Sequence, residues 1–155
     1  MMIRFAWADD DRLAALAPEH WRAKASEKRF EKDRRLELVA GGLLFEMLKE
    51  SGLPPASFVF ASSPSGKPYL IGQPGLHFSI SHSDEVVMCV VADHPVGCDV
   101  EKVVPLDDDM KEVVGSIADW TLREAKFKCG EHAGEPRHVA APAGYSAALA
   151  ERILI

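Results

Sequence analysis

The stretch VGCDVEK, Val96–Lys102, alternates apolar and polar residues in the way that is typical of a strand with one buried face. Successive side chains of a strand point to opposite faces, so Asp99 and Glu101 project to the same side. Two neighbouring carboxylates repel each other, and a hard divalent cation such as Mg²⁺ removes the repulsion by binding them. The alternative is a solvated strand face on which Glu101 pairs with Lys102. The strand alone leaves both interpretations open.

Two further strand-like segments precede this stretch and are joined to it by short turns. LHFSIS, 76–81, alternates apolar and polar residues, and VVMCVVA, 86–92, is a continuous apolar run that is typical of a central buried strand. The three segments predict an antiparallel meander. Together with a long helix predicted over 31–50, they indicate an α+β fold in which an antiparallel sheet packs on that helix.

The helix over 31–50 is predicted from an apolar stripe at helical spacing. Gly41 and Gly42 interrupt it at a cost of about 1 kcal/mol each relative to alanine, so we expect this pair to allow the close approach of a neighbouring element. The remaining patterns predict short helices at 11–17 and 18–28, a strand at 57–61, an acidic irregular segment at 105–116 and a helix at 117–129. The segment from 145 fits either a strand or a helix, and we expect a strand at its start.

Composition limits the class of protein. The 155 residues are 47% hydrophobic, which fits one domain with its own core, and the net charge of −6 gives no reason to expect nucleic acid or an anionic membrane as a partner. No apolar run is long enough to span a bilayer, and acidic residues at 9–11 stand where a signal peptide would be apolar, so we expect a cytoplasmic location. Cys89 and Cys98 lie in apolar runs and are expected to be small core residues.

Glu124 adds a third carboxylate to the candidate chemistry. It lies in WTLREAKFK, 120–128, with Lys128 four residues further along on the same helical face. The pair is either an ordinary surface ion pair or a carboxylate and an ammonium that face the sheet and complete a metal site. The pattern alone does not decide between them.

Basic residues supply two candidate anion sites. Between Arg22 and Arg35 there are seven Lys and Arg against three acidic residues, which suits either a phosphate or a solvated helix face. SPSGKPYL, 63–70, presents Lys67 between glycine and proline but lacks the spacing of a Walker A motif. A hydrolytic triad of Ser81, His82 and Asp99 is not expected, because adjacent residues do not readily meet as nucleophile and base.

Four segments occur in a specific order: GKPYL, LHFSISHS, VGCDVEK and WTLREAKFK. This ordered set resembles the larger type of 4′-phosphopantetheinyl transferase, the type that activates peptide synthetases and polyketide synthases, over roughly residues 25–129. The resemblance implies Mg²⁺-dependent transfer of 4′-phosphopantetheine from coenzyme A to a serine of an acyl or peptidyl carrier protein. It also implies a fold of two pseudo-symmetric α+β halves with the active site between them.

Each motif of the resemblance implies roles for its residues. It implies that the metal is bound by carboxylates and the coenzyme A phosphates by basic and hydroxyl groups, while a base on the 120–128 segment takes the serine proton. By motif, the metal ligands are Asp99, Glu101 and Glu124; the contacts to coenzyme A are Lys67, Ser81 and His82, with Lys28, Arg29 and Arg35 towards the adenosine 3′-phosphate; and the catalytic residues are Glu124 and Lys128.

The sequence departs from the family pattern in two places. Arg123 stands where a lysine is usual, which keeps the charge but changes its geometry. Only 22 residues separate Glu101 from Glu124, and 27 follow Lys128. We therefore expect one domain over 1–155, with a first half at 1–103 and a shortened second half at 104–155; a compact second half or cover by another subunit both stay open.

Three functions follow from these patterns. An active transferase is the leading hypothesis, because the three acids and Lys128 are all present. The alternative is a catalytically reduced relative that binds coenzyme A or a carrier protein without turnover, which the short second half favours. A metal-dependent phosphohydrolase of another family is the third. The sequence leaves the oligomeric state, monomer or homo-oligomer, undecided.

Overall fold

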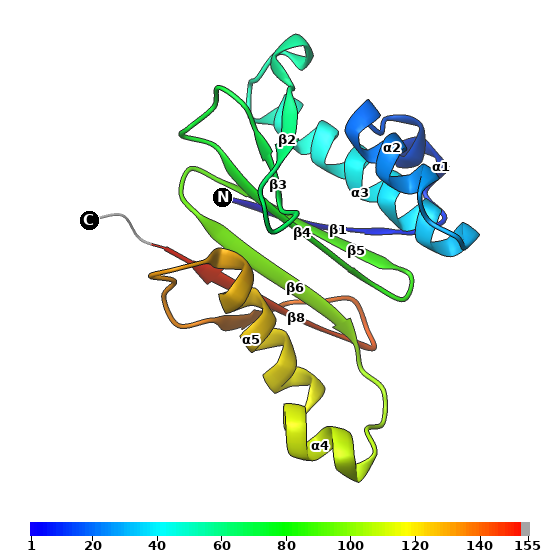
Figure 1. The fold of residues 1–155 in the computed structure, drawn as a ribbon, viewed down its shortest axis with the longest axis vertical. Helices are drawn as coiled ribbons and strands as arrows, with labels where there is room; N and C mark the ends of the chain where they lie inside the picture. Colours follow the sequence, from blue (N-terminus) through cyan, green and yellow to red (C-terminus); the bar gives the residue numbers. More distant parts are fainter. Residues whose placement is uncertain (153–155) are drawn as a thin grey trace.

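Residues 1–152 are described by a computed structural model, in which two three-stranded sheets are each covered by a helix (Figure 1). A two-stranded hairpin, β2–β3, extends from the first sheet. The elements are β1 Met2–Trp7, α1 Asp11–Ala15, α2 Glu19–Ser26, α3 Glu31–Glu50, the 3₁₀ turn η1 Pro55–Ser57, β2 Phe60–Ser62, β3 Pro68–Leu70, β4 His77–Ser83, β5 Val86–Ala92, β6 Val96–Lys102, α4 Asp108–Val114, α5 Ile117–Cys129, β7 Arg137–Val139 and β8 Tyr145–Glu151.

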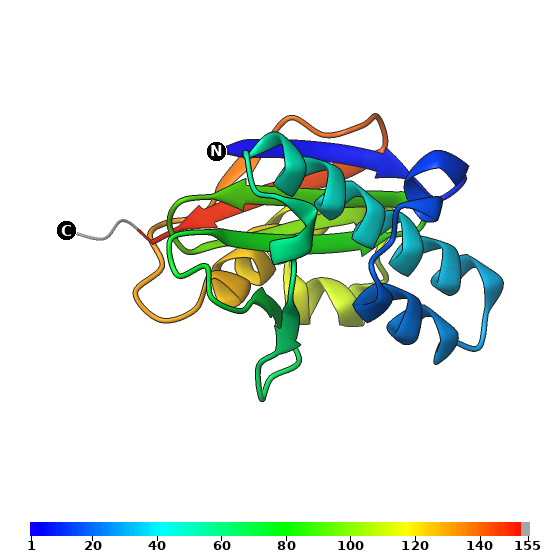
Figure 2. The same cartoon turned by 90° about the horizontal axis from the view of Figure 1, so that it is seen from above.

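The first sheet is antiparallel in the order β1–β5–β4, and α3 covers one of its faces. Every residue of β5 is buried, as its continuous apolar run predicts, because both of its faces are covered. One set of β5 side chains packs under α3 with Val39 and Leu44, while the alternate set packs against β6 and β8. Figure 1 shows the two sheets between α3 and α5, and in the view of Figure 2 α3 lies in front of the strands.

The two glycines of α3 permit the close approach that the sequence predicts. A Cβ at Gly42 would lie 1.7 Å from the carbonyl oxygen of Leu13, and one at Gly41 would lie 2.6 Å from Cβ of Trp21. Both distances are far below van der Waals contact, so α1 and α2 rest on the bare backbone of α3. This contact buries Trp21, which is 1% exposed, in the first core.

The predicted meander is wrong in its last strand. β6 does not pair with β5, whose two edges are occupied by β4 and by β1, a strand that the sequence patterns did not predict. β6 instead pairs antiparallel with β8, so that Asp99 lies opposite Ala148, and β7 completes a second sheet in the order β6–β8–β7. The partner that displaces β5 is thus about fifty residues away in sequence, beyond the range of local patterns.

A row of serine hydroxyls joins the two sheets. The strands β4 and β6 run parallel, and the backbone N–H groups on the free edge of β6 donate to serine side chains of β4 instead of to carbonyl oxygens. We call this row the serine seam. Its three hydrogen bonds are Cys98 N to Ser79 Oγ at 3.0 Å, Val100 N to Ser81 Oγ at 3.2 Å and Lys102 N to Ser83 Oγ at 2.9 Å.

Helix α5 lies directly on β6 because Gly97 has no side chain. A Cβ at Gly97 would lie 2.2 Å from the backbone nitrogen of Cys129 and 2.3 Å from the carbonyl oxygen of Ala125. Small buried residues make up the rest of this contact, with Ala148 and Ala150 of β8 opposite α5. The backbone of α5 is therefore held at a short, fixed distance from β6, the strand that carries Asp99.

Several other expectations can be compared with the structure. The predicted irregular segment 105–116 is wrong, because Asp107 caps α4 by accepting a hydrogen bond from Met110 N at 2.8 Å. The strand predicted at 57–61 begins later, at β2, after a 3₁₀ turn that starts with proline. The strand expected near 145 is confirmed as β8, and Cys89 and Cys98 are free and buried, as expected. Among residues 1–152 no helix is both long and apolar enough to cross a membrane.

An ion-pair cluster fastens the turn between β5 and β6 to the end of β8. His94 Nδ1 lies 2.7 Å from Asp93 Oδ1, and its Nε2 lies 2.6 Å from Glu151 Oε1. Hydrogen bonds to Asp93 and Glu151 raise the pKa of His94 above its ordinary 6.5. The protonated imidazole therefore stabilises the folded state.

We predict that Gly97→Ala lowers the free energy of unfolding by about 3 kcal/mol, the upper end of the cost of overpacking, because two backbones would have to separate. Urea denaturation measures this. Gly75→Ala is the matched control, since a Cβ there meets nothing within 4 Å. Equal urea midpoints for the two variants would contradict the close contact of α5 with β6.

We predict a pH-dependent effect of His94→Asn. A raised folded-state pKa gives stability that is fully present below about 6.5 and is lost as the pH rises through the raised value. The variant should therefore be less stable than the unsubstituted chain at about pH 6 and nearly equal to it at about pH 8.5. Urea midpoints at both pH values test this, and an equal deficit at both would refute the charged role of His94.

Candidate functional site

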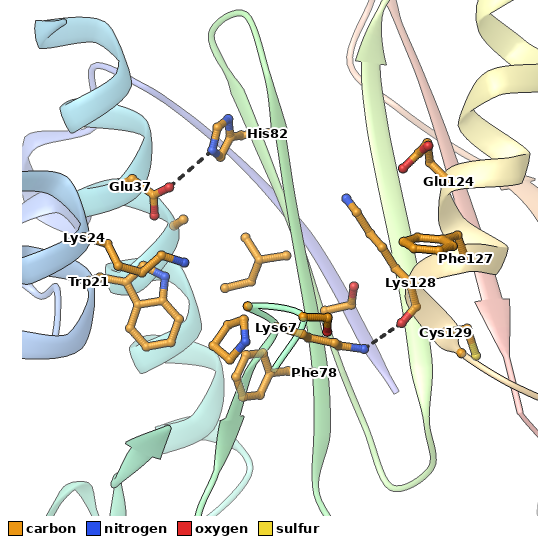
Figure 3. Close-up of a pocket in the computed structure, with 17 residues that line it drawn as sticks. Trp21, Lys24, Glu37, Lys67, Phe78, His82, Glu124, Phe127, Lys128 and Cys129 are labelled. Atoms are coloured by element: carbon orange, nitrogen blue, oxygen red, sulfur yellow. Dashed lines mark hydrogen bonds and ion pairs between the residues drawn. The ribbon is translucent and has the colours of Figure 1, made fainter. Parts of the chain in front are cut away.

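A pocket of about 570 Å³ lies between α2, α3 and β4 on one side and α5 on the other (Figure 3). It brings together residues from three of the four sequence motifs that are far apart along the chain. Aromatic rings line it beside charged groups. The predicted site residues in its lining are Lys67, His82, Glu124 and Lys128, and the lining also includes Trp21, Lys24, Glu37, Phe78 and Phe127.

One wall holds a buried carboxylate among basic groups. Glu37 of α3 is 7% exposed; its Oε1 lies 3.7 Å from His82 Nε2 and 3.9 Å from Lys28 Nζ. Burial acts to raise the pKa of Glu37, but His82, Lys24 and Lys28 outweigh it and hold the pKa below 4.5. Glu37 thus carries a charge that holds His82 at one end of the pocket and Lys28 just outside its lining.

Lys67 connects the β2–β3 hairpin to the opposite wall. Its Nζ donates to the carbonyl oxygen of Lys128 at 2.8 Å and to that of Val96 at 3.2 Å. Burial lowers the pKa of Lys67. Because both acceptors are neutral, its ammonium charge is not cancelled by them.

Asp99 lies at the junction of α5, β6 and β4. It is 3% exposed, and its Oδ1 accepts from Lys128 Nζ and from Ser81 Oγ, both at 3.1 Å. Within residues 1–152 its other oxygen, Oδ2, is buried and has no hydrogen-bond partner. A buried carboxylate oxygen without a donor is costly, and a bound cation is one way to satisfy it.

Glu101 is the second acid of the strand. Burial, and next the negative charge of Asp99, raise the pKa of Glu101 to about 7. The two carboxylates therefore repel each other, as expected for side chains on the same side of a strand. A cation between them would reverse this repulsion into attraction, so the pair fits Mg²⁺, which needs only one or two protein carboxylates.

Glu124 is not gathered with that pair. In the described part of the chain no three His, Cys, Asp or Glu side chains lie close enough to form a metal site. Glu124 instead lines the pocket from α5, one helical turn before Lys128. The ammonium of Lys128, at Asp99 Oδ1, is the positive charge that the structure places at this carboxylate.

The other predicted contacts to coenzyme A lie in different places. Arg35 donates to the carbonyl oxygen of Ala8 and to Asp11 and lines a separate pocket. Arg29 stacks on Phe30, with its guanidinium 5.4 Å from the ring centre. Neither lines the 570 Å³ pocket, and Ser81 is buried beside it, with its hydroxyl towards Asp99.

Sequence reasoning missed Trp21, Lys24 and Glu37 as part of this pocket. A glutamate next to the apolar stripe of α3 was the available signal for Glu37, because a carboxylate rarely enters a core without partners. The structure also explains why Ser81 and His82 form no nucleophile–base pair. They lie on opposite faces of β4, with Ser81 on Asp99 and His82 on Glu37.

Arg123, which stands in place of the usual lysine, points away from these acids. Its guanidinium donates to the carbonyl oxygen of Val113 at 3.3 Å and lies 5.6 Å from the ring centre of Trp120. It therefore ties α4 to α5.

Comparison with known proteins gives consistent matches. The chain is 31% identical to a 4′-phosphopantetheinyl transferase of Bacillus subtilis over 76% of its length and 53% of that protein, and 30% identical to the 4′-phosphopantetheinyl transferase psf-1 of Bacillus pumilus over 69% of its length and 54% of that protein. The chain is thus similar to 4′-phosphopantetheinyl transferases over most of its own length. A further such protein, Sfp of Bacillus subtilis strain 168, is 26% identical over 75% of the chain and 52% of Sfp.

The chain spans about half the length of the curated relatives it matches, and no protein-family model matches it. Its mixed architecture of helices and antiparallel sheets is compatible with a 4′-phosphopantetheinyl transferase. The division into a first half and a shortened, pseudo-symmetric second half stays a prediction.

We predict that Lys128 and Asp99 are energetically coupled. Lys128→Met removes a partner from a buried carboxylate and should destabilise the chain, whereas the same change should cost little in an Asp99→Asn background. A double-mutant cycle in urea should give a coupling of about 1–3 kcal/mol. Lys126→Met is the control, since Lys126 pairs with the exposed Glu135. Additive effects of the Lys128 and Asp99 substitutions would contradict the contact.

Proposed function

We propose that this chain transfers 4′-phosphopantetheine from coenzyme A to a serine hydroxyl of an acyl or peptidyl carrier protein, with Mg²⁺. The serine oxygen forms a bond to the phosphorus that bears pantetheine. The bond from that phosphorus to the bridging oxygen breaks, and 3′,5′-ADP leaves with that oxygen. The named activity of the similar proteins supports the type of reaction.

The observation that carries the proposal is the convergence of Lys67, His82, Glu124 and Lys128 on one pocket, with Asp99 at 3.1 Å from Lys128 Nζ. Phosphoryl transfer needs positioning and neutralisation of charge more than covalent help from the protein. The pocket offers ammonium and imidazole groups for phosphate oxygens and carboxylates for a cation.

Asp99 and Glu101 are proposed to hold Mg²⁺. Glu124 is not gathered with this pair in the described chain, so its predicted role as a third ligand requires its side chain to turn from the pocket wall towards Asp99. Both strand carboxylates fit the role of metal ligand because they project to the same side of β6 and, within residues 1–152, one Asp99 oxygen has no donor. When bound, the cation supplies neutralisation of phosphate charge. Lys128, released from Asp99, is then placed to pair with a phosphate oxygen.

The basic end of the pocket is proposed to hold the phosphates of coenzyme A. Lys67 keeps its charge between two carbonyl oxygens, and Glu37 fixes His82 and Lys28. Lys24 adds a further ammonium to the lining. Of the predicted contact set, Lys28, Arg29 and Arg35 lie outside the lining of this pocket.

Glu124 is proposed to take the proton of the incoming serine. It lines the pocket on the same face of α5 as Lys128, so a hydroxyl next to the phosphate lies within its reach. Transfer of this proton to Glu124 leaves the serine oxygen free to attack the phosphorus as the bond to 3′,5′-ADP breaks. We propose a carrier protein as the partner and the cytoplasm as the location.

Incubation with coenzyme A, Mg²⁺ and several apo carrier proteins tests the proposal. Intact mass spectrometry should show the addition of one phosphopantetheine group to a carrier, and Glu124→Gln should lower the rate at least about 100-fold, as expected for loss of a general base. Glu135→Gln, a change at an exposed glutamate, should leave the rate unchanged. Binding of coenzyme A without any gain of mass on any carrier would overturn the proposal in favour of a binding protein.

A further inference from the structure

We infer that Ser81 is a positioning residue that fixes the orientation of the Asp99 carboxylate, and thereby turns Oδ2 towards an incoming cation. The inference rests on the proposed function, because it concerns the same carboxylate. It differs from the role that the family resemblance implies for Ser81, which is a contact to a coenzyme A phosphate.

The hydroxyl of Ser81 is fully used inside the protein. A serine hydroxyl has one hydrogen to donate. Ser81 Oγ donates that hydrogen to Asp99 Oδ1 at 3.1 Å and accepts from Val100 N at 3.2 Å. With both bonds made and the residue 6% exposed, Ser81 has no hydrogen left for a phosphate oxygen.

The two bonds act on one carboxylate from two sides. Ser81 on β4 and Lys128 on α5 both contact Oδ1 of Asp99, and Val100 N holds the Ser81 hydroxyl in place from the same strand as Asp99. Rotation of the carboxylate would exchange its two oxygens only by breaking both contacts to Oδ1. Oδ2 is therefore the oxygen that stays without a donor within residues 1–152.

Within the serine seam, Ser79 can be compared with Ser81. Ser79 Oγ accepts from Cys98 N at 3.0 Å in the same way as Ser81 accepts from Val100 N, and it is equally buried at 2% exposed. No hydrogen bond joins Ser79 to a carboxylate among the residues that the structure describes. Loss of either hydroxyl leaves one strand N–H without its acceptor, but only Ser81 also releases Asp99.

We therefore compare Ser81→Ala with Ser79→Ala. Both should lose similar stability in urea, since each leaves one buried N–H unpaired. Binding of Mn²⁺ is followed by its EPR signal without coenzyme A, because Ser79 also lines the pocket proposed for coenzyme A. It should weaken about 10- to 100-fold in Ser81→Ala and remain unchanged in Ser79→Ala. This range is the usual effect of losing a group that orients a metal ligand.

The result that overturns the inference is equal Mn²⁺ affinity in the two variants while the unsubstituted chain binds Mn²⁺ and transfers phosphopantetheine. Absence of both activities in the unsubstituted chain would instead refute the proposed function and, with it, the inference. If Ser81→Ala does not fold, Ser81→Cys keeps the side-chain size with a weaker donor. Full Mn²⁺ affinity in Ser81→Cys would then refute the role, and reduced affinity would support it.

Discussion

The serine seam is the constraint on which the site depends. β6 has no strand partner on the edge that faces β4, so its N–H groups need acceptors that do not come from a sheet ladder. Alternate serines of β4 provide them at each second residue, which matches the period of a strand. The seam therefore fixes the register of β6 against β4, and with it the place of Asp99 relative to the pocket.

A small number of carboxylates and basic side chains lies around the serine seam. Asp99 and Glu101 bring two carboxylates to one face of β6, and Lys128 brings an ammonium to them from α5. The bare backbone of Gly97 keeps α5 close enough for this contact. Glu37 performs a similar task on the far wall, where it binds His82 and Lys28. Each wall thus contains a buried carboxylate with basic partners.

Local periodicity was enough to predict the elements that carry the site. The stripe of α3, the alternation of β4 and the two same-face acids of β6 are all properties of seven to twenty consecutive residues. Pairing was not predictable in the same way, because β6 pairs with β8 and β5 with β1 across long stretches of chain. The short helix α4 was missed because its acidic residues form a capped first turn without an apolar stripe.

The site residues also differ in whether a local sequence motif could predict them. Lys67, His82, Asp99 and Lys128 lie in compact motifs whose spacing already restricts their geometry, and the structure places all four at or beside the pocket. Arg29 and Arg35 came from a loose cluster of like charges, and they face elsewhere. Glu37 and Lys24 needed the contact of α2 and α3 with the pocket, which no local pattern contains.

The bonding of Lys67 has a consequence for how a ligand approaches. Its ammonium is held by two carbonyl oxygens, so a unit of positive charge remains at the pocket of a chain whose net charge is −6. A polyanion is repelled by the net charge of the chain and attracted locally by this ammonium. Electrostatic steering of this kind selects the orientation of a polyphosphate during diffusion, before any contact is made, and it weakens as ionic strength rises.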